Sequence, residues 1–345
     1  MADATTMSSR LTLQDVIRTI PRDCFQPHPG RALGLVTLSL STTALAYAWL
    51  IWNPIGWLLP LAWVFAGTSL TGWFVIAHDC GHRSFSKSTR LNNWLGSLLM
   101  LPLLYPFHAW RLGHDHHHRF TNQMQEDNAW RPFRPSEYTC ASRGMQVFYR
   151  GLRSYFWWVA SIAHWAVVHF GLSPVPSHLS AHERQAWRFS VGLVLGFGLI
   201  ALPSLTYFLG IWGLVKFWVM PWLVYHFWMS TFTLFHHTHP HIPFHEAEAW
   251  DPVQAQLSGT VHCQYPFWVE WLCHDINVHI PHHLSTAIPS YHLRRADRAL
   301  QARFADRMTR THFNWTLIRS VVQTCHLYDT VRPYLSFRQY HRHSS

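Results

Sequence analysis

The sequence predicts an all-α integral membrane protein, in which four transmembrane helices form two hairpins and a cytoplasmic helical cap holds a histidine-rich metal site. Composition is the first observation: 49% of the 345 residues are hydrophobic and only 13% are charged, against about 25% charged in soluble domains. The second is that four apolar stretches reach the roughly 20 residues that a helix needs to cross a bilayer. The third is that histidines gather in three short clusters outside those stretches.

The four predicted spans fall into two pairs, and a short uncharged turn joins the members of each pair. Residues 53–56 (Asn-Pro-Ile-Gly) separate the first two spans, and residues 210–213 (Gly-Ile-Trp-Gly) separate the last two. Glycine, proline and asparagine favour turns, so two helical hairpins are expected. The spans run from Leu33 to Trp52, from Trp57 to Ala77, from Val191 to Trp212 and from Leu214 to Phe235.

Basic residues indicate the orientation of the hairpins. The segments that follow them are rich in arginine, as in Arg111, Arg119 and Arg131, and again from Arg294 to Arg307. By the positive-inside rule these segments are cytoplasmic, and the first thirty residues lack the features of a signal peptide, so both termini are expected inside. The chain then divides into a cytoplasmic N-terminal segment (1–32), a first hairpin (33–77), a cap with two histidine clusters (78–190), a second hairpin (191–235) and a cap with the third cluster and a basic tail (236–345), all forming one unit.

Two further apolar stretches, from Leu91 to Trp110 and from Tyr155 to Phe170, are long enough to be considered as spans. If only one of them crossed, the histidine clusters would lie on opposite faces, so both are predicted to be interfacial or re-entrant helices. The net charge of +10 suits an anionic membrane face or an acidic protein partner. Nucleic acid is not expected as a partner, because the basic residues alternate with the spans.

The three clusters read HDCGH, HDHHH and HIPHH, and the predicted topology puts all of them on one side of the membrane. Imidazole is the commonest metal-binding side chain, and one zinc ion takes at most four protein ligands, so eight histidines have room for two metal ions. Spacings of three and four residues put histidines of the first two clusters on one helical face. Isolated histidines such as His164, His169 and His226 are expected to be structural. The eight predicted ligands are His78, His82, His114, His117, His118, His279, His282 and His283.

These clusters resemble the signature HxxxH, HxxHH and HxxHH of the membrane-bound fatty acid desaturases. The segments YPFHAWRLGHDHHHRFTNQMQEDNAW and QYPFWVEWLCHDINVHIPHHLSTAIPSYHLR are similar to the cyanobacterial and plastid acyl-lipid omega-6 (delta-12) branch, and the likeness covers most of Trp73 to Arg294. The resemblance implies an O2-dependent enzyme in a bacterial plasma or thylakoid membrane that converts an oleoyl chain of a membrane glycerolipid to linoleoyl.

The resemblance also implies two non-haem iron ions and an external electron donor, a ferredoxin or a cytochrome b5-like protein. Since the chain has no haem-attachment motif and no dinucleotide fingerprint, the electrons must come from outside. The basic segment from Arg294 to Arg307 could bind an acidic donor or anionic lipid. A ninth ligand is expected just after the fourth span, with His237 preferred, His239 as the alternative, and His236 and His241 as neighbours.

Carboxylates beside the clusters are candidates to orient the ligands, because a ligating imidazole usually donates its second N–H to a carboxylate or carbonyl. Asp79, Asp115 and Asp275 each directly follow a histidine. Glu126 and Asp127 either orient the site or cap a helix, and the sequence alone does not choose between these roles. Five aromatic residues near the clusters are candidates to line an acyl tunnel, although aromatic residues at membrane boundaries more often serve as belt or packing residues: Trp110, Trp130, Phe267, Trp268 and Trp271.

Other functions are also compatible with part of this sequence pattern. A desaturase of delta-9 or omega-3 regiochemistry, or a related membrane di-iron hydroxylase or alkane oxygenase, would share the clusters and differ in product. A metal transporter is a more distant alternative, because transporters place ligands near the middle of the bilayer, whereas these clusters follow the helix ends.

Overall fold

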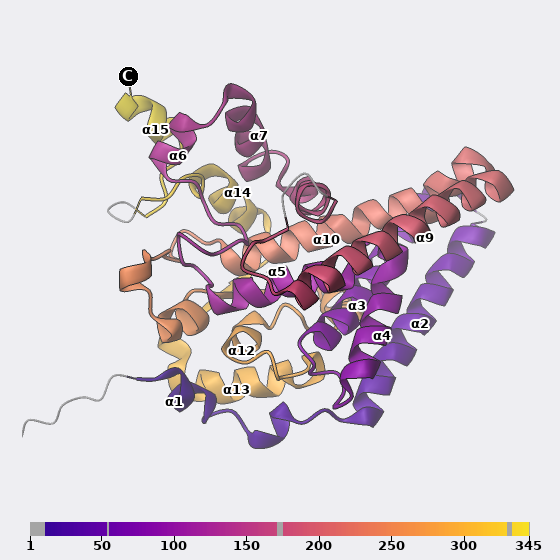
Figure 1. Ribbon diagram of the computed structural model, residues 1–345, viewed down its shortest axis with the longest axis horizontal. Coiled ribbons are helices and arrows are strands. Elements are labelled where there is room, and N and C mark those ends of the chain that lie inside the picture. Colours follow the sequence, from indigo (N-terminus) through magenta and orange to yellow (C-terminus); the bar gives the residue numbers. More distant parts are fainter. Residues whose placement is uncertain (1–10, 54, 171–174, 330–332, 345) are drawn as a thin grey trace, which may run out of the picture.

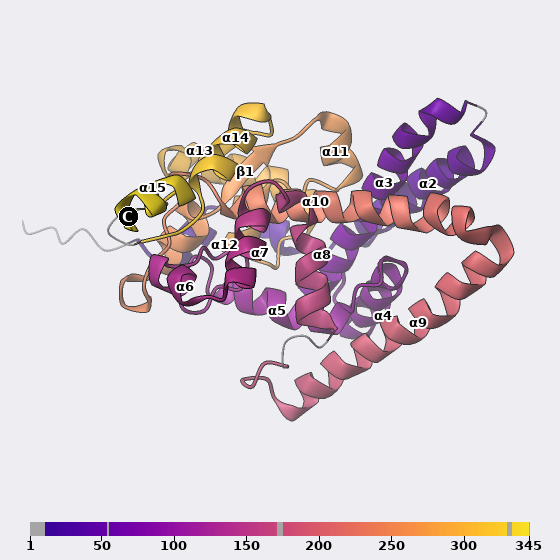
Figure 2. The same ribbon diagram turned by 90° about the horizontal axis from the view of Figure 1, so that it is seen from above.

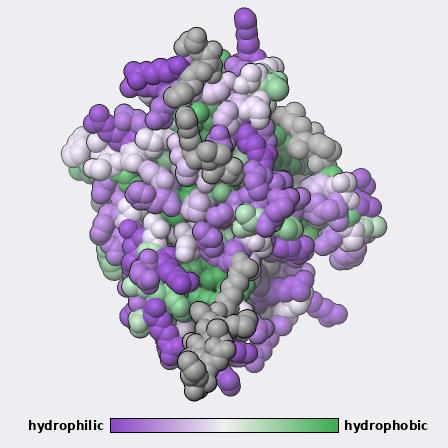
Figure 3. Space-filling view, turned by 90° about the vertical axis from the view of Figure 1, so that its left-hand side faces the viewer, coloured by the Kyte–Doolittle hydropathy of each residue, from purple (hydrophilic) through white to green (hydrophobic). Residues whose placement is uncertain are grey.

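The computed structural model describes residues 11–53, 55–170, 175–329 and 333–344 and is almost entirely helical. Long helices extend together toward one end of the molecule, and shorter helices gather at the other end, where the C-terminus lies (Figure 1). The face at that second end is predominantly hydrophilic (Figure 3). This division matches a bundle of apolar helices that carries a polar cap.

Helix α3 (Leu59–Gly81) is the centre of the long-helix bundle and packs against α2 (Pro29–Trp52), α4 (Thr89–Met100) and α10 (Met220–His237). Nearly every residue of α3 from Ala66 onward is buried. A Cβ atom at Gly67 would lie 2.5 Å from the carbonyl oxygen of Pro221, so glycine is required where α3 and α10 approach most closely. This packing carries the end of α3 into the protein interior.

Helix α9 (Ala181–Leu214) is followed directly by a π-helical turn (Val215–Val219) and then by α10. Gly210 has φ of 70° and kinks the stretch, which glycine tolerates because it lacks a Cβ atom, and the two helices diverge from the kink as a V (Figure 2). The predicted turn at residues 210–213 therefore lies at the reversal. The helix that contains the third predicted span begins before Val191, because a capping box at Ser180 and Glu183 starts it at Ala181. The point where this helix enters the membrane stays a prediction.

Three helical stretches are long and apolar enough to cross a membrane: Pro29–Trp52, Gly56–Gly81 and Ala181–His237. The last contains the third and fourth predicted spans in one continuous stretch. Four separate spans and their orientation thus stay predictions.

The two additional apolar stretches are too short or too broken to be spans. The stretch from Leu91 to Trp110 is divided among α4, a 3-10 turn (Leu101–Leu103) and α5 (Phe107–Arg119), with Leu104 in a left-handed conformation between them. The other contains a 3-10 turn (Trp157–Val159), α8 (Ala160–His164) and a π-helical turn (Trp165–His169). Neither reaches the length of a spanning helix, and an interfacial position for both stays a prediction.

The cap consists of short helices and one pair of strands, which an all-α prediction did not include. Strands β1 (Val261–Gln264) and β2 (Thr309–His312) pair in parallel with Val261 opposite Thr309. Strands of four residues carry too little periodicity to be read from sequence. The cap helices are α1 (Leu13–Ile17), α6 (Pro135–Cys140), α7 (Arg143–Arg153), α11 (Phe267–Leu272), α12 (His279–Leu284), α13 (Leu293–Phe304), α14 (Trp315–Thr324) and α15 (Phe337–Ser344).

Helix α12, which carries HIPHH, is enclosed by its own apolar cluster. Val278, Ile280 and Leu284 pack with Leu293 and Leu300 of α13, and all five side chains are buried. The alternation of apolar residues and histidines in α12 therefore points one set into this cluster and leaves the histidines to face α3, α5 and α10.

Candidate metal centre

The structure brings the three histidine clusters together from four helices. His78 lies in the last turn of α3 and His82 is its C-cap residue, whereas His114, His117 and His118 lie on α5. The HIPHH cluster forms most of α12, and the last residue of α10 is His237. Sequence separations of more than 150 residues are closed because α3, α5 and α10 end at the same place.

Five of the histidines form what we call the first histidine group, whose ligand nitrogens all lie within 4.8 Å of one another: His78, His82, His114, His118 and His282. His114 Nε2 lies 3.1 Å from the Nε2 atoms of both His78 and His118. His282 Nε2 lies 3.0 Å from His118 Nε2. The nitrogens thus converge on a common point rather than on separate partners.

Four further histidines form what we call the second histidine group: His117, His237, His279 and His283. The nitrogens of His117, His237 and His283 also lie within 4.8 Å of one another, and His279 Nε2 lies 2.9 Å from His237 Nε2. The two groups adjoin, because the rings of His118 and His283 stack with centroids 4.2 Å apart. Nine histidines therefore surround two neighbouring points.

This donor set fits a pair of metal ions. Two nitrogens bound at right angles to one ion at about 2.1 Å lie about 3.0 Å apart, as the closest pairs do here. A ring nitrogen carries either one proton or one lone pair, so mutual hydrogen bonds cannot satisfy all of these atoms. Several buried ring nitrogens have no hydrogen-bond partner among the described residues, including His82 Nε2, His117 Nε2 and His283 Nε2.

The protonation state also suits ligation. Burial, followed by repulsion between neighbouring imidazoles, lowers the pKa of five of these histidines well below the usual value of 6.5. A neutral imidazole offers the lone pair that a metal ion needs. The histidines with this depressed pKa are His114, His118, His279, His282 and His283.

Polar residues hold the second histidine group from behind. His117 Nδ1 lies 2.7 Å from the buried carboxylate of Asp127, which also accepts a hydrogen bond from the backbone N–H of Asn122. His283 Nδ1 lies 3.0 Å from Gln256 Oε1 and 3.2 Å from Thr121 Oγ1. In both rings Nδ1 is anchored and Nε2 faces the group, as is usual for metal-ligating histidines.

Of these anchors, sequence reasoning considered only Asp127, and there with a helix cap as the alternative. Gln256 lies in a π-helical turn (Gln254–Ser258) that carries no motif. Thr121 follows α5 without any pattern of its own. Glu126, the other open candidate, contacts His116 at 3.3 Å, outside both groups.

The three predicted orienting aspartates have different surroundings. Asp115 lies 3.6 Å from His82 Nδ1 and 3.5 Å from Arg111. Asp79 lies 3.6 Å from the Nδ1 atom of its neighbour His78 and accepts a hydrogen bond from the backbone N–H of Ser290 at 2.8 Å. The two histidine contacts exceed hydrogen-bond length. The structure brings Asp275 to Arg294, at 2.6 Å, and to no histidine side chain that it describes.

The other histidines lie outside both groups. His239 is a partly exposed neighbour of His241, with ring centroids 5.2 Å apart, so the structure brings His237 rather than His239 to the ligands. His236 is buried against His279, with centroids 4.5 Å apart. His226 contacts Ser161 at 2.6 Å inside the helix bundle, and the side chain of His169 lies outside the described residues.

A cavity of about 510 Å³ leads from the histidine groups toward α7 and α8. His114 and His117 line it at one end, and Trp110 stacks on His114 with centroids 4.8 Å apart. Trp110 and Trp130 line the cavity as predicted. The prediction is wrong for three aromatic residues, because α11 lies at the surface and exposes them: Phe267, Trp268 and Trp271.

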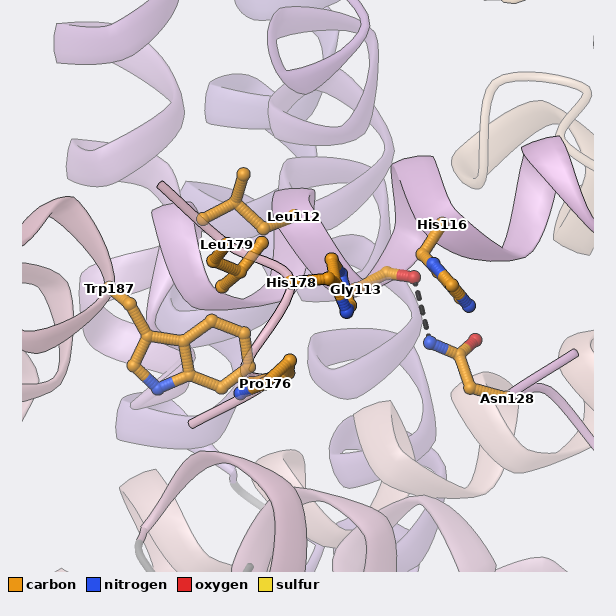
Figure 4. Close-up of a pocket in the computed structure, with 8 residues that line it drawn as sticks. All are labelled: Leu112, Gly113, His116, Asn128, Pro176, His178, Leu179 and Trp187. Atoms are coloured by element: carbon orange, nitrogen blue, oxygen red, sulfur yellow. Dashed lines mark hydrogen bonds between the residues drawn. The ribbon is translucent and has the colours of Figure 1, made fainter. Parts of the chain in front are cut away.

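A second, smaller pocket of about 190 Å³ lies on the other side of α5, between this helix and the start of α9 (Figure 4). Its wall includes Trp187, Leu112 and His178. Asn128 closes one side by donating a hydrogen bond to the Gly113 carbonyl oxygen at 2.9 Å. No histidine of either group lines this pocket, so of these two pockets only the larger one borders the histidine groups.

The model of the family described as "Fatty acid desaturase" matches residues 55–316, which include all nine histidines. The chain belongs to the fatty acid desaturase family. It is 49% identical over 332 residues to a protein of Picosynechococcus sp. named sn-1 oleoyl-lipid 12-desaturase, covering 96% of this chain and 94% of that relative.

Two other relatives of this desaturase are informative. A Synechocystis sp. protein, also named sn-1 oleoyl-lipid 12-desaturase, is 48% identical and is aligned over 95% of this chain and 92% of its own length. The chloroplastic omega-6 fatty acid desaturase of Spinacia oleracea is 44% identical over 95% of this chain and 72% of its own length. Family membership confirms the resemblance read from the histidine clusters, and it makes this chain an oxidoreductase.

Proposed function

We propose that this desaturase introduces a cis double bond at the delta-12 position of an oleoyl chain esterified in a membrane glycerolipid, producing linoleoyl. The observation that carries the proposal is the 49% identity, over nearly the whole of both chains, to a relative named for this reaction. The cavity that ends at His114 and His117 supports it, because an acyl chain needs an enclosed apolar route to the oxidising centre.

We infer that each histidine group holds one iron ion. The first ion would be held by His78, His82, His114, His118 and His282, and the second by His117, His237, His279 and His283. Iron supplies the activation of O2 that removal of hydrogen from unactivated methylene groups requires, since no side chain can perform it. Asp127 and Gln256 would fix the ring orientation of their histidines.

The residues around the metal centre would hold the substrate and exclude water. Trp110 lines the cavity and contacts the rings of both His78 and His114, and its rigid ring would position a methylene group beside the ligands. Tyr105 and Met229 line the part of the cavity within the helix bundle. Apolar side chains in this part favour the alkyl chain over water.

We propose four crossings for the three apolar stretches, with the kink at Gly210 dividing the last of them at the outer face. This topology puts both termini and all nine histidines on the cytoplasmic side. The membrane itself would be a bacterial plasma membrane or a thylakoid membrane. The arginine-rich cap segments support this orientation.

We propose that an acidic electron carrier, a ferredoxin or alternatively a cytochrome b5-like protein, binds the exposed face of α13. Arg298, Arg303 and Arg307 are exposed, and none of them forms an ion pair with any residue that the structure describes. Helix α13 packs directly on α12, which carries three ligands. Reversing two of these charges, as in Arg298→Glu with Arg303→Glu, should raise the KM for the carrier and flatten its salt dependence.

The reaction is tested by expressing the chain in a host that contains oleate and lacks linoleate, with a competent ferredoxin system. Gas chromatography of lipid fatty acids should show linoleate. Only delta-9 or omega-3 products would reject the delta-12 assignment, and a hydroxylated oleate would indicate a hydroxylase. No new product, with the donor and the protein both present, would reject the proposal.

A further inference from the structure

Helix α7 and the turn that follows it expose an unusual amount of apolar surface for a protein cap. Val147 is 73% exposed and Tyr155 is 82% exposed. Soluble surfaces seldom gather large apolar side chains in one contiguous place, so this surface calls for a partner. It comprises Met145, Val147, Phe148, Tyr155, Phe156 and Trp158.

The other side of α7 is anchored in the cap. Tyr149 is buried and its hydroxyl donates to the His326 carbonyl oxygen at 2.6 Å, while Phe133 stacks on its ring. Arg143 and Arg150 are exposed beside the apolar face, and Arg150 contacts His341 at 2.8 Å. An apolar face bordered by arginines is the pattern of a helix that lies in a membrane interface.

The apolar face of α7 continues into the cavity that leads to the histidines. Phe148 and Leu152 of α7 line the cavity together with Val167 and Val168, which follow α8. Phe148 and Val167 are also partly exposed to the outside, by 46% and 37%. Helix α8 packs on α10, and α7 packs on the turn before α8, so α7 and α8 are neighbours in the fold (Figure 2).

Two arginines line the cavity and could contact the polar part of a glycerolipid. Arg153 is only 5% exposed and lines the cavity near α7. Its guanidinium group lies 5.4 Å from the Trp130 ring and donates to the Trp130 carbonyl oxygen. Arg131 lines the same part and pairs with Glu137 at 2.9 Å. Ester and headgroup oxygens accept hydrogen bonds from such groups, while the tail favours the apolar part beyond them.

We propose that α7 lies in the bilayer interface with its apolar face among the lipids, and that the acyl chain of a membrane glycerolipid enters the cavity sideways, between α7 and α8. The identity of the occupant rests on the proposed function. The contact between α7 and the membrane is independent of the proposed function, because it is inferred from the exposed apolar face of α7. Substrate thus reaches the metal centre without leaving the bilayer.

The membrane contact is tested by spin labelling in lipid nanodiscs. Cys140, the one cysteine that is exposed among the described residues, is first replaced by serine. A label at Val147→Cys should be several-fold more accessible to O2 than to a polar nickel chelate. A matched label at Ala302→Cys on the exposed side of α13 should show the opposite order. Equal behaviour of the two labels would overturn the proposal.

The occupant is tested by replacing Phe148 with a photoreactive benzoyl-phenylalanine and irradiating the protein in native membranes. Mass spectrometry should find a glycerolipid attached at position 148 and none when the same group replaces Ala302. The adduct should also form in the His282→Ala variant, because entry precedes chemistry. If adducts form but the wild type makes no linoleate, the proposed reaction would be rejected and the proposed entry between α7 and α8 would be supported. If linoleate forms but no adduct is found, and the label at Val147 is exposed to water, the proposed entry between α7 and α8 would be rejected and the proposed reaction would not.

Discussion

The two histidine groups are built in different ways. Two helices supply four members of the first group as pairs one turn apart, and its nearest carboxylates, Asp79 and Asp115, stay 3.6 Å from the rings. Three helices supply the second group, and Asp127 and Gln256 hold its rings at 2.7 and 3.0 Å. Local helix geometry therefore sets the first group, whereas tertiary hydrogen bonds set the second.

This difference predicts which substitutions should disturb the ring positions of each group. A ring on a helix keeps its position when a distant side chain changes, because the backbone defines where the Cβ atom points. A ring that depends on a partner from a loop loses its orientation when that partner is removed. The two groups should respond alike to loss of a ligand and differently to loss of an anchor.

Loss of a ligand from either group is the largest expected effect. His118→Ala and His283→Ala should each remove detectable linoleate formation, because the proposed chemistry requires a metal ion in each group. His237→Ala should do the same, whereas the matched control His239→Ala should keep most of the activity. Gas chromatography, with immunoblots to confirm equal protein, measures this. Activity in His237→Ala together with its loss in His239→Ala would reverse the assignment of the ninth ligand.

Loss of the Asp127 carboxylate should affect the second histidine group and not the first. Asp127→Asn should lower metal affinity at the second group by about 10- to 100-fold, the usual effect of removing such a partner. Asp275→Asn is the matched control, since Asp275 pairs with Arg294, and it should leave metal affinity within about 2-fold. Competition with a chelator, followed by metal analysis, provides the measurement. Similar metal loss in both variants would contradict the assigned role of Asp127.

A smaller effect is expected for Gln256→Leu. Neutral hydrogen bonds are roughly half as strong as charge-assisted ones, and Thr121 still reaches His283 Nδ1 at 3.2 Å. Metal affinity should fall by less than in Asp127→Asn, and adding Thr121→Val should deepen the loss. The same chelator titration tests the order, and a larger loss in Gln256→Leu than in Asp127→Asn would show that the anchors are ranked wrongly.

Acid should destabilise the metal-free protein. The pKa of His114, His118, His282 and His283 is lowered by burial, whereas in the unfolded chain histidines titrate near 6.5. As pH falls through about 6.5, the unfolded state binds protons that the folded state does not, so the free energy of unfolding decreases. Thermal unfolding of metal-free protein at pH 7.5 and pH 5.5 should show the lower midpoint at pH 5.5. A midpoint that is equal or higher at pH 5.5 would contradict the burial of neutral rings.

The same contrast explains how much the sequence could reveal. The ligands are visible because i, i+3 and i, i+4 spacing repeats in HDCGH and HDHHH, and hydropathy marks the long helices. Gln256 and Thr121 carry no such signal, since only the folded chain brings them to His283. The exposed position of α11 was missed for a related reason: its aromatic residues are near HIPHH in sequence, but the helix lies on the surface.

Helix bounds were predicted less well than helix existence. The reversal at residues 210–213 could be located because glycine is needed there, but helical hydrogen bonding through Val215–Val219 joins the two helices. The amphipathic helix α7 was not predicted at all, because its apolar residues are interspersed with arginines and fall below any hydropathy threshold for a span.

Iron content of the purified protein tests the central claim most directly. If the first and second histidine groups each hold one ion, the wild type should contain two iron ions per chain, with Mössbauer spectra of nitrogen-rich high-spin sites. Asp127→Asn under mild chelation should retain one. A single ion per chain in the fully loaded wild type, or loss of both ions together from Asp127→Asn, would contradict two separately held metal ions.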